Sequence, residues 1–185
     1  DKHKRLMYKQ QEKRFAAKEK FTKIEDYLES LELKITIFCN EKSVIPRLSQ
    51  MCQKTNQFNL TTKRYTEGDI EKYMNDNESK IYGFSVQDKY GDSGITGLCI
   101  ILPTEKKEMV VIDTFLMSCR VIGRNIEYAF MDFIINEMKT LNKTLINARY
   151  IETPKNRQVE TFYDNLNFCL TKQDRTDKYY LLKID

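Results

Sequence analysis

Apolar residues follow two different periods along the chain, and the two kinds of run succeed one another from residue 33 onward. Short apolar runs, alternating or continuous, indicate strands. We expect strands at residues 33–38, 81–87, 95–102, 110–116, 145–151, 168–172 and 179–184. Apolar positions at spacings of three and four indicate helices. We expect helices at residues 1–31, 43–52, 66–74, 126–138 and 156–166. This order predicts an α/β (α+β) domain with one mixed central sheet.

Two of these helices carry sequence signals for their first turn. Ser43 is a candidate N-cap, and Pro46 comes early enough to fit the first turn of the helix that follows. Thr66 and Asp69 resemble a capping box in which Asp replaces the usual Glu or Gln. A turn signal, Tyr-Gly-Asp-Ser-Gly at residues 90–94, separates two of the predicted strands.

The segment 110–138 combines a strand, a turn and a helix. The strand is almost wholly apolar apart from Asp113, and Gly123 separates it from the helix. Backbone amides at the start of a helix attract anions, and Arg120 and Arg124 would add charge-assisted contacts to a phosphate. The alternative is a plain turn with solvated arginines. A phosphate-bearing cofactor or carrier arm is therefore the first ligand to consider.

Positive charge is concentrated at the beginning of the chain. Residues 1–23 contain nine Lys or Arg residues and three acidic ones, a net charge of +6, and the whole chain carries +4, which leaves −2 for residues 24–185. A nearly neutral body argues against a broad nucleic-acid footprint. The basic stretch has no Gly or Pro. We interpret residues 1–31 as a charged helical linker that packs on the domain of residues 32–185 or joins it to another domain.

The cysteines and the single histidine narrow the possible chemistry. Five Cys residues are scattered without a C-x-x-C pair, which favours a reduced, cytoplasmic protein over a disulfide scaffold or a metal site. The only histidine, His3, lies in the basic stretch, so histidine-based catalysis is not expected. No apolar run approaches the length of a membrane span, so we do not expect a membrane as partner. Because the body of the chain is nearly neutral, we do not expect a nucleic acid either. The chain begins with Asp1, which suggests a piece of a longer protein.

The order of elements and two segments resemble the GNAT N-acetyltransferase fold. The strand, Gly123 turn and helix are similar to the acyl-CoA pyrophosphate loop of that family, and residues 156–168 resemble its late Asn…Phe-Tyr-x-x-x-Gly-Phe helix. In GNAT enzymes the fourth and fifth strands splay apart, and the pantetheine arm lies between them as a surrogate strand. The resemblance implies that these strands are residues 110–119 and 145–151.

The resemblance also implies roles for individual residues. Tyr163 falls where many GNAT enzymes place the tyrosine that protonates the departing thiolate; the alternative is a tyrosine packed under the last strands. The implied contacts to CoA, or to the phosphopantetheine of a carrier, are Leu116, Ser118, Arg120, Gly123, Arg124, Asn125 and Asn156.

The Gln/Arg-x-x-Gly-x-Gly/Ala loop of the family fits in two registers. In the first, Arg120 and Gly123 match and Asn125 replaces the final small residue. In the second, which agrees better with the apolar phase of the helix, Ile122, Asn125 and Glu127 stand at the three key positions. We prefer the second register. Glu127 would then lie near the phosphates and disfavour free CoA relative to a carrier-bound pantetheine.

A narrower resemblance joins residues 47–66 with residues 118–124. Both segments look like the C-terminal region of FkbH-like proteins, the HAD-type enzymes of glyceryl and methoxymalonyl carrier-protein biosynthesis, and the charged leader is similar to their interdomain linker. The resemblance implies two partners, an acyl carrier protein and a missing N-terminal HAD domain. The Asp-x-Asp phosphatase motif of the HAD domain is absent from this sequence.

A polar stretch precedes the second predicted helix of the domain. Its uncharged side chains could form hydrogen bonds with a hydroxyacyl group or with the backbone of their own loop. We favour substrate contact, because a loop rarely needs so many side-chain amides to bond its own backbone. The candidate substrate-binding residues are Gln53, Asn56, Gln57, Asn59 and Thr61.

Two further residues are candidates for the chemistry. Cys119 lies near a helix start and two arginines, where a thiol can carry an acyl group, although a small buried thiol is the commoner outcome. Asp113 is a candidate base for an incoming nucleophile, or a hydrogen-bonded structural carboxylate. Together with Tyr163 these form the predicted catalytic set.

Three functions follow from these patterns. The first is an acyltransferase-type domain of an FkbH-like protein, which assists transfer of a glyceryl-like acyl group to or from a carrier-protein pantetheine thiol. The second is a non-catalytic module that docks the pantetheine or its carrier. The third is a CoA-dependent N-acetyltransferase.

Overall fold

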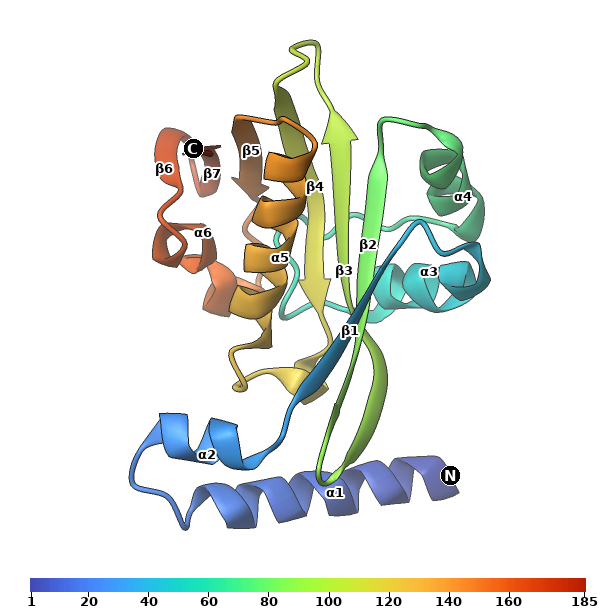
Figure 1. Cartoon of the computed structure of the whole chain (residues 1–185), viewed down its shortest axis with the longest axis vertical. Coiled ribbons are helices and arrows are strands. Elements are labelled where there is room, and N and C mark those ends of the chain that lie inside the picture. Colours follow the sequence, from blue (N-terminus) through green and yellow to red (C-terminus); the bar gives the residue numbers. More distant parts are fainter.

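A seven-stranded mixed sheet forms the centre of the computed structural model, which describes residues 1–185 (Figure 1). The strand order is β1-β2-β3-β4-β5-β7-β6, and every neighbouring pair is antiparallel except β4 and β5. The mixed sheet predicted from the sequence is confirmed. The strands are β1 (Lys34–Cys39), β2 (Lys80–Asp88), β3 (Gly91–Pro103), β4 (Met109–Met117), β5 (Leu145–Tyr150), β6 (Cys169–Asp174) and β7 (Asp177–Lys183).

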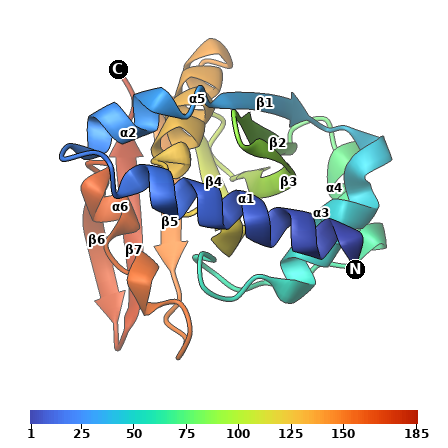
Figure 2. The same ribbon diagram turned by 90° about the horizontal axis from the view of Figure 1, so that it is seen from below.

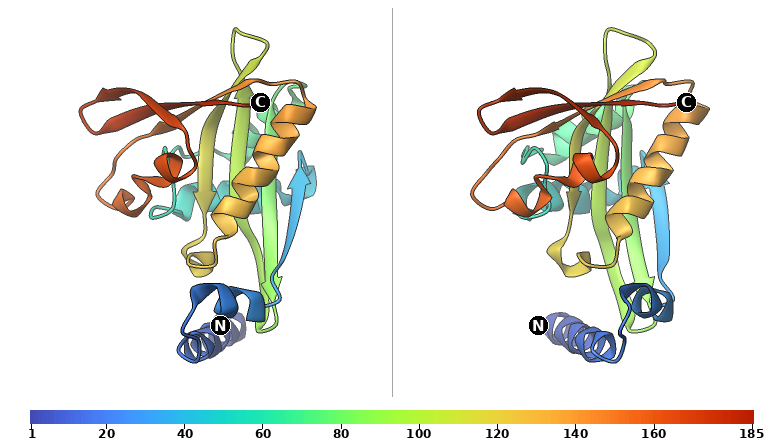
Figure 3. Two further views of the ribbon diagram at one scale, coloured as in Figure 1. Left: turned by 60° about the vertical axis from the view of Figure 1, so that its left-hand side comes forward. Right: turned by 90° about the vertical axis from the view of Figure 1, so that its left-hand side faces the viewer.

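Helices cover both faces of this sheet. Along β3, Leu98 and Ile100 pack against α3 and α4, whereas Cys99 and Ile101 belong to the larger core under α5. Because successive side chains of a strand point to opposite faces, the sheet divides the core into two layers. Figure 3 shows the helices on the two faces of the sheet from the side. No helix has the length and apolar content needed to span a bilayer. The helices are α1 (Lys2–Lys18), α2 (Ile24–Ser30), α3 (Ile45–Lys54), α4 (Glu67–Asn75), α5 (Ile126–Thr140) and α6 (Phe162–Asn165), with short 3-10 turns η1 (Lys42–Val44), η2 (Cys119–Val121) and η3 (Arg157–Val159).

Of the two N-caps predicted from the sequence, one is confirmed and the other is wrong. Thr66 accepts from the amide of Asp69, and the Asp69 carboxylate accepts from the amide of Thr66, so the predicted capping box is confirmed. Ser43 does not cap α3. Glu41 accepts from its hydroxyl and its amide instead, which closes η1 before α3 begins. Pro46 lies in the first turn of α3 as expected.

Two predicted helices are interrupted. Residues 1–31 form α1 and α2 with a break between Lys18 and Ile24, and the predicted helix at 156–166 is only η3 followed by the four-residue α6. The second interruption has a tertiary cause: the side chain of Asn156 is bonded to groups outside its own segment and does not cap a helix. In the predicted turn at 90–94, residues from Gly91 onward already belong to β3.

The basic helix α1 crosses the lower end of the sheet, beneath the β2–β3 hairpin (Figures 1 and 2). Arg14 of α1 is 4% exposed and binds Asp88 at the end of β2 through Nε to Oδ2 at 2.7 Å and Nη2 to Oδ1 at 2.8 Å. Arg124 donates to the same Oδ2 at 3.0 Å. The Asp88 side chain is fully buried, so two distant arginines and one carboxylate fasten α1 to the domain.

Candidate functional site

The strands β4 and β5 separate partway along their length. They pair in parallel only between Met109–Ile112 and Leu145–Ala148. The β3–β4 register shifts at this point, because Ile100 lies opposite Thr114 and Ile101 opposite Ile112, which leaves Asp113 as an extra residue in β4. Beyond Asp113 the outer edge of β4 no longer meets β5. This split is the place to which the resemblance assigns a pantetheine arm.

The chain itself fills the split with residues 58–60, which we call the inserted segment. Leu60 donates from its amide to the carbonyl of Phe115 at 3.1 Å, and Met117 donates to the carbonyl of Phe58 at 3.0 Å. On the other side, Ile151 donates to the carbonyl of Leu60 at 2.8 Å. The segment runs antiparallel to β4 and joins it to the end of β5. The backbone groups that a surrogate strand would use are therefore already bonded.

Asn156 fixes the inserted segment in place. It is fully buried, and its Nδ2 donates to the carbonyls of Asn59 and Ile151, each at 2.9 Å. Its Oδ1 accepts from the amide of Thr153 at 2.7 Å and from the Tyr150 hydroxyl at 3.3 Å. The polar atoms of Asn156 are thus all bonded within the protein, and its predicted contact with a cofactor stays a prediction.

Most of the polar stretch before α4 serves its own backbone. Asn59 is fully buried, donates to the carbonyl of Thr55 at 3.1 Å and accepts from the amide of Thr62 at 2.9 Å. Thr61 is also buried and donates to the carbonyl of Asp113 at 2.9 Å. Asn59 and Thr61 thus stabilise the loop in this structure, and their predicted contact with a substrate stays a prediction.

The other three residues of this stretch lie nearer the surface. Gln53 donates to the carbonyl of Tyr65 at 2.9 Å, and Asn56 accepts from Arg64. Gln57 is exposed and lines a cavity of about 360 Å³ together with Asn56, Ser118 and residues 119–120. Only Asn56 and Gln57 therefore remain in reach of a ligand in that cavity.

The start of α5 has an unusual backbone. Gly123 has φ of +90°, which favours glycine, and Asn125 has φ of +57° directly before the first helical residue. The side chain of Asn125 is exposed and accepts no helix amide. Gly123 and Asn125, the middle positions of the two registers, thus both have a positive φ, and the preference for the second register stays a prediction.

Glu127 lies in the first turn of α5, where the second register would place a phosphate. Its Oε2 is buried and has no hydrogen-bond partner. Burial raises the pKa of the Glu127 carboxyl group, against a smaller lowering by its own backbone amide. The adjoining cavity, about 150 Å³, is smaller than the roughly 300–1,000 Å³ of ligand pockets. A negative side chain in a small space does not fit a pyrophosphate group.

Replacing Glu127 by Gln is expected to stabilise the protein at neutral pH. A carboxyl group whose pKa is raised by folding favours the folded state at low pH, and this contribution is lost as the pH rises above the ordinary value of 4.5. Glu127→Gln replaces the carboxyl group by a side chain that does not ionise. The free energy of unfolding should therefore rise on the order of 1 kcal/mol at pH 7 and change little at pH 4. Urea unfolding at both pH values measures it. An exposed control on α4, Glu71→Gln, should show no such pH difference, and a destabilised Glu127→Gln at pH 7 would contradict the assignment.

The two arginines of the turn have separate surroundings. Arg124 is 5% exposed and donates to Asp88 and to the carbonyl of Arg120, and its predicted phosphate contact stays a prediction. Arg120 points the other way, toward α1, where its Nη1 lies 3.1 Å from the sulfur of Met7. Its Nε donates to the Ser118 hydroxyl at 3.3 Å. Of the pair, only Arg120 is free to meet an anion.

The predicted catalytic residues are not brought together. Tyr163 is 1% exposed, its hydroxyl has no hydrogen-bond partner, and its ring packs against Phe168 and Tyr180 with centroids 5.0 and 5.4 Å away. Burial raises the pKa of its hydroxyl well above the ordinary value. Tyr163 therefore lies in the core, as in the alternative prediction, and its role as a proton donor stays a prediction.

Asp113 and Cys119 lie at opposite ends of the split. Asp113 accepts from Lys63 at 2.5 Å, from the Tyr65 hydroxyl at 2.6 Å and from Thr114 at 3.0 Å, so it is a bonded structural carboxylate. Cys119 is exposed in η2, contrary to the alternative of a buried thiol. Leu116 is fully buried against α3 and α4, and the Ser118 amide pairs with the carbonyl of Thr96 at 2.8 Å. A CoA or phosphopantetheine arm does not fit this set of residues as they stand.

Two important residues were missed in the sequence. Arg47 of α3 lines two cavities, of about 910 and 360 Å³, together with Cys119 and Arg120. Asp88 receives two arginines and also accepts from the amides of Tyr90 and Gly91. The turn residues after Asp88 were a signal for a carboxylate that caps a turn, but no local pattern connects Arg47 with Arg120.

The fold can be compared with known proteins. No protein-family model matches the chain, and no curated protein matches its sequence. Among solved structures, the ribosomal-protein-S18-alanine N-acetyltransferase from Escherichia coli superposes with a TM-score of 0.61 at 11% identity, over 82% of this chain and 95% of that one. An N-acetyltransferase from Staphylococcus aureus Mu50 gives a TM-score of 0.59 at 14% identity, over 82% and 99%. The protein yncA from Salmonella typhimurium, solved with its cofactor acetyl-CoA, gives 0.60 at 11%, over 82% and 95%. The predicted fold is confirmed: the chain has the fold of the GNAT acetyltransferases, a fold consistent with acyl transfer.

Proposed function

We propose that this chain is the GNAT-like domain of an FkbH-like protein and that it assists transfer of a glyceryl-like acyl group to or from the pantetheine thiol of an acyl carrier protein. It does so by docking the carrier, without binding acyl-CoA itself. The observation that carries this proposal is the inserted segment, which closes the split between β4 and β5. Its partners are the carrier protein and a HAD domain joined through residues 1–31.

The free energy of opening the split supports a docking role. Opening would break three backbone hydrogen bonds of about 1 kcal/mol each and would expose the ring of Phe58, which contributes about 2 kcal/mol by its burial. A closed state favoured by about 5 kcal/mol weakens the apparent affinity of a ligand for the split by about 10³–10⁴-fold. The unfavourable position of Glu127 acts in the same direction.

The charge distribution suits an acidic partner. The net charge of residues 1–23 is +6, and α1 holds the exposed side chains of Lys9 and Lys13 at the lower end of the sheet. A positive surface attracts an acidic carrier protein and orients it during encounter, more than it adds to affinity at high salt. Docking through the carrier's surface does not require its arm to enter the split.

Calorimetric titrations test the proposal. Acetyl-CoA is expected to give a flat titration, whereas the apo and holo forms of the carrier protein should bind with equal affinity, because the arm takes no part. Replacing Lys9 and Lys13 by Glu should weaken carrier binding about five- to ten-fold at low salt, and Lys139→Glu on α5 should not. Binding of the holo carrier alone, or tight binding of acetyl-CoA, would refute the docking role.

The fold supports a second candidate, a CoA-dependent N-acetyltransferase. The similar structures include N-acetyltransferases, and one of them was solved with acetyl-CoA. In this chain the extra residue Asp113 marks the apex of a split of the same kind. This candidate requires the inserted segment to leave the split. Faster amide exchange of Leu60 and Ile151 on addition of acetyl-CoA would favour it over docking.

A further inference from the structure

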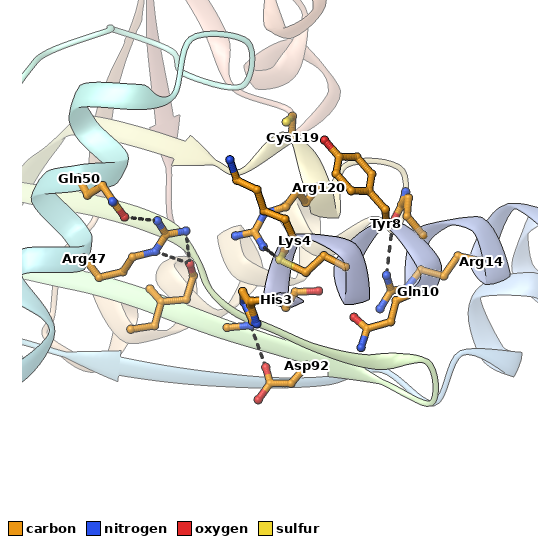
Figure 4. A pocket seen from close by; sticks show the side chains of 15 residues that line it. His3, Lys4, Tyr8, Gln10, Arg14, Arg47, Gln50, Asp92, Cys119 and Arg120 are labelled. Carbon is orange, nitrogen blue, oxygen red and sulfur yellow. Dashed lines mark hydrogen bonds between the residues drawn. The ribbon is translucent and has the colours of Figure 1, made fainter. Parts of the chain in front are cut away.

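A cavity of about 910 Å³ lies between α1 and the main body of the domain (Figure 4). Its walls come from four parts of the chain: α1, α3, the first residues of β3, and η2. A second cavity of about 360 Å³ adjoins it and shares Arg47, Cys119 and Arg120 with it. Because four separate elements build it, this space belongs to the tertiary structure and not to one loop.

Arg47 and Arg120 face this cavity without a carboxylate partner. Arg47 donates through Nε and Nη2 to the carbonyl of Ile95 at 3.2 and 3.0 Å, and through Nη1 to Gln50 at 2.6 Å. Arg120 reaches only the Ser118 hydroxyl and the sulfur of Met7. Neither forms an ion pair. Asp92 is the one acidic residue of the lining, and its carboxylate accepts from the amide of Gly94.

The surroundings of Arg47 and Arg120 favour the binding of an anion. Burial lowers the pKa of both guanidinium groups, and the charge of Arg120 lowers the pKa of Arg47 further. The buried arginine pair of this protein, Arg14 and Arg124, shares the carboxylate of Asp88. The pair at the cavity has no equivalent counter-ion. Two partly desolvated like charges without one are unfavourable unless a ligand supplies it.

We infer that this cavity is a binding site for a small phosphomonoester, whose phosphate is held between Arg47 and Arg120. A phosphomonoester carries close to two negative charges at neutral pH, which matches two guanidinium groups, and its oxygens accept the forked N–H donors of arginine. Lys4 of α1 points into the same space (Figure 4). The uncharged remainder of the ligand would meet Tyr8, Gln10 and Ser93. The inference is independent of the proposed carrier docking.

Titration of the full chain with inorganic phosphate, phenyl phosphate and acetate tests the site. Phosphate and phenyl phosphate are expected to bind and acetate to bind at least about ten-fold more weakly, because a monoanion balances only one arginine. Arg47→Gln and Arg120→Gln should each weaken phenyl phosphate binding about ten-fold or more, and the double variant should abolish it. Arg157→Gln is the matched control, since Arg157 is exposed and paired with Glu152 away from the cavity.

A measurement on the unaltered protein covers the case in which a variant fails to fold. In amide correlation spectra, phenyl phosphate should shift the signals of Ile95, Cys119 and Arg120 and leave those of β6 unchanged. Flat titrations with both phosphates, equal binding of acetate, retained binding in the double variant, or shifts confined to other parts of the chain would each overturn the inference. The carrier titrations above do not depend on any of these outcomes.

Discussion

Asp88→Ala is expected to lower the free energy of unfolding by about 3–5 kcal/mol, the largest single effect of those predicted here. The substitution removes the carboxylate that Arg14 and Arg124 share and leaves two buried guanidinium groups without a counter-ion. It also frees the amides of Tyr90 and Gly91 in the β2–β3 turn. Because Arg14 is the buried link between α1 and the sheet, α1 should detach before the domain unfolds.

Urea unfolding at pH 7 measures the loss, and amide exchange along α1 measures the detachment. Asp132→Ala, an exposed carboxylate on α5, is the control and should change stability by less than about 0.5 kcal/mol. A loss below about 1 kcal/mol for Asp88→Ala, with α1 still protected, would show that the ion pairs do not hold the helix.

The dependence of the free energy of unfolding on acid pH is a second test of the role of Asp88. Burial by itself would raise the pKa of Asp88, but the hydrogen bond from Arg14, the amide of Tyr90 and the charges of both arginines outweigh it and lower that pKa below the ordinary value of 3.8. A carboxyl group with a lowered pKa stabilises the fold above that ordinary value and loses this contribution as the pH falls through its folded pKa. Asp88→Asn should therefore remove part of the acid-induced destabilisation below about pH 4.

Asn156→Ala is expected to release the inserted segment at a loss of about 3 kcal/mol. The substitution leaves the carbonyl of Asn59, in the interior, and the half-buried carbonyl of Ile151 and amide of Thr153 without their side-chain partner. Each unsatisfied buried group costs about 1–3 kcal/mol, and partial relaxation toward solvent reduces the sum. The amides of Leu60 and Ile151 should then exchange faster than those of β2 and β3.

The control for this variant is Asn136→Ala, which removes an exposed amide side chain from α5 and should leave stability nearly unchanged. Unaltered exchange of Leu60 and Ile151 in Asn156→Ala would show that the backbone bonds alone hold the segment. Acetyl-CoA binding that emerges only in this variant would identify the segment as the barrier that keeps acetyl-CoA out of the unaltered protein.

The sequence predicted the elements better than it predicted the site. The strand at 110–116, the capping box at Thr66 and the start of α5 depend on neighbours a few residues apart, and the structure agrees with each. The helix predicted at 156–166 is interrupted, and the side chain of Asn156 at its start binds a carbonyl 97 residues away. Tyr163 was placed by its resemblance to a motif, whereas its environment is set by rings from other elements.

The sequence by itself determined the order and period of the strands and helices, the concentration of positive charge in the first 23 residues, and the left-handed turn before α5. These features follow from local periodicity and backbone preference, which short stretches of chain encode. Only the tertiary structure decided that residues 58–60 close the split, that Arg14 and Arg124 share Asp88, and that Arg47 meets Arg120 at one cavity. The local sequence pattern predicts on which face of a helix or strand a side chain lies. The groups that this side chain contacts depend on the packing of segments far apart along the chain.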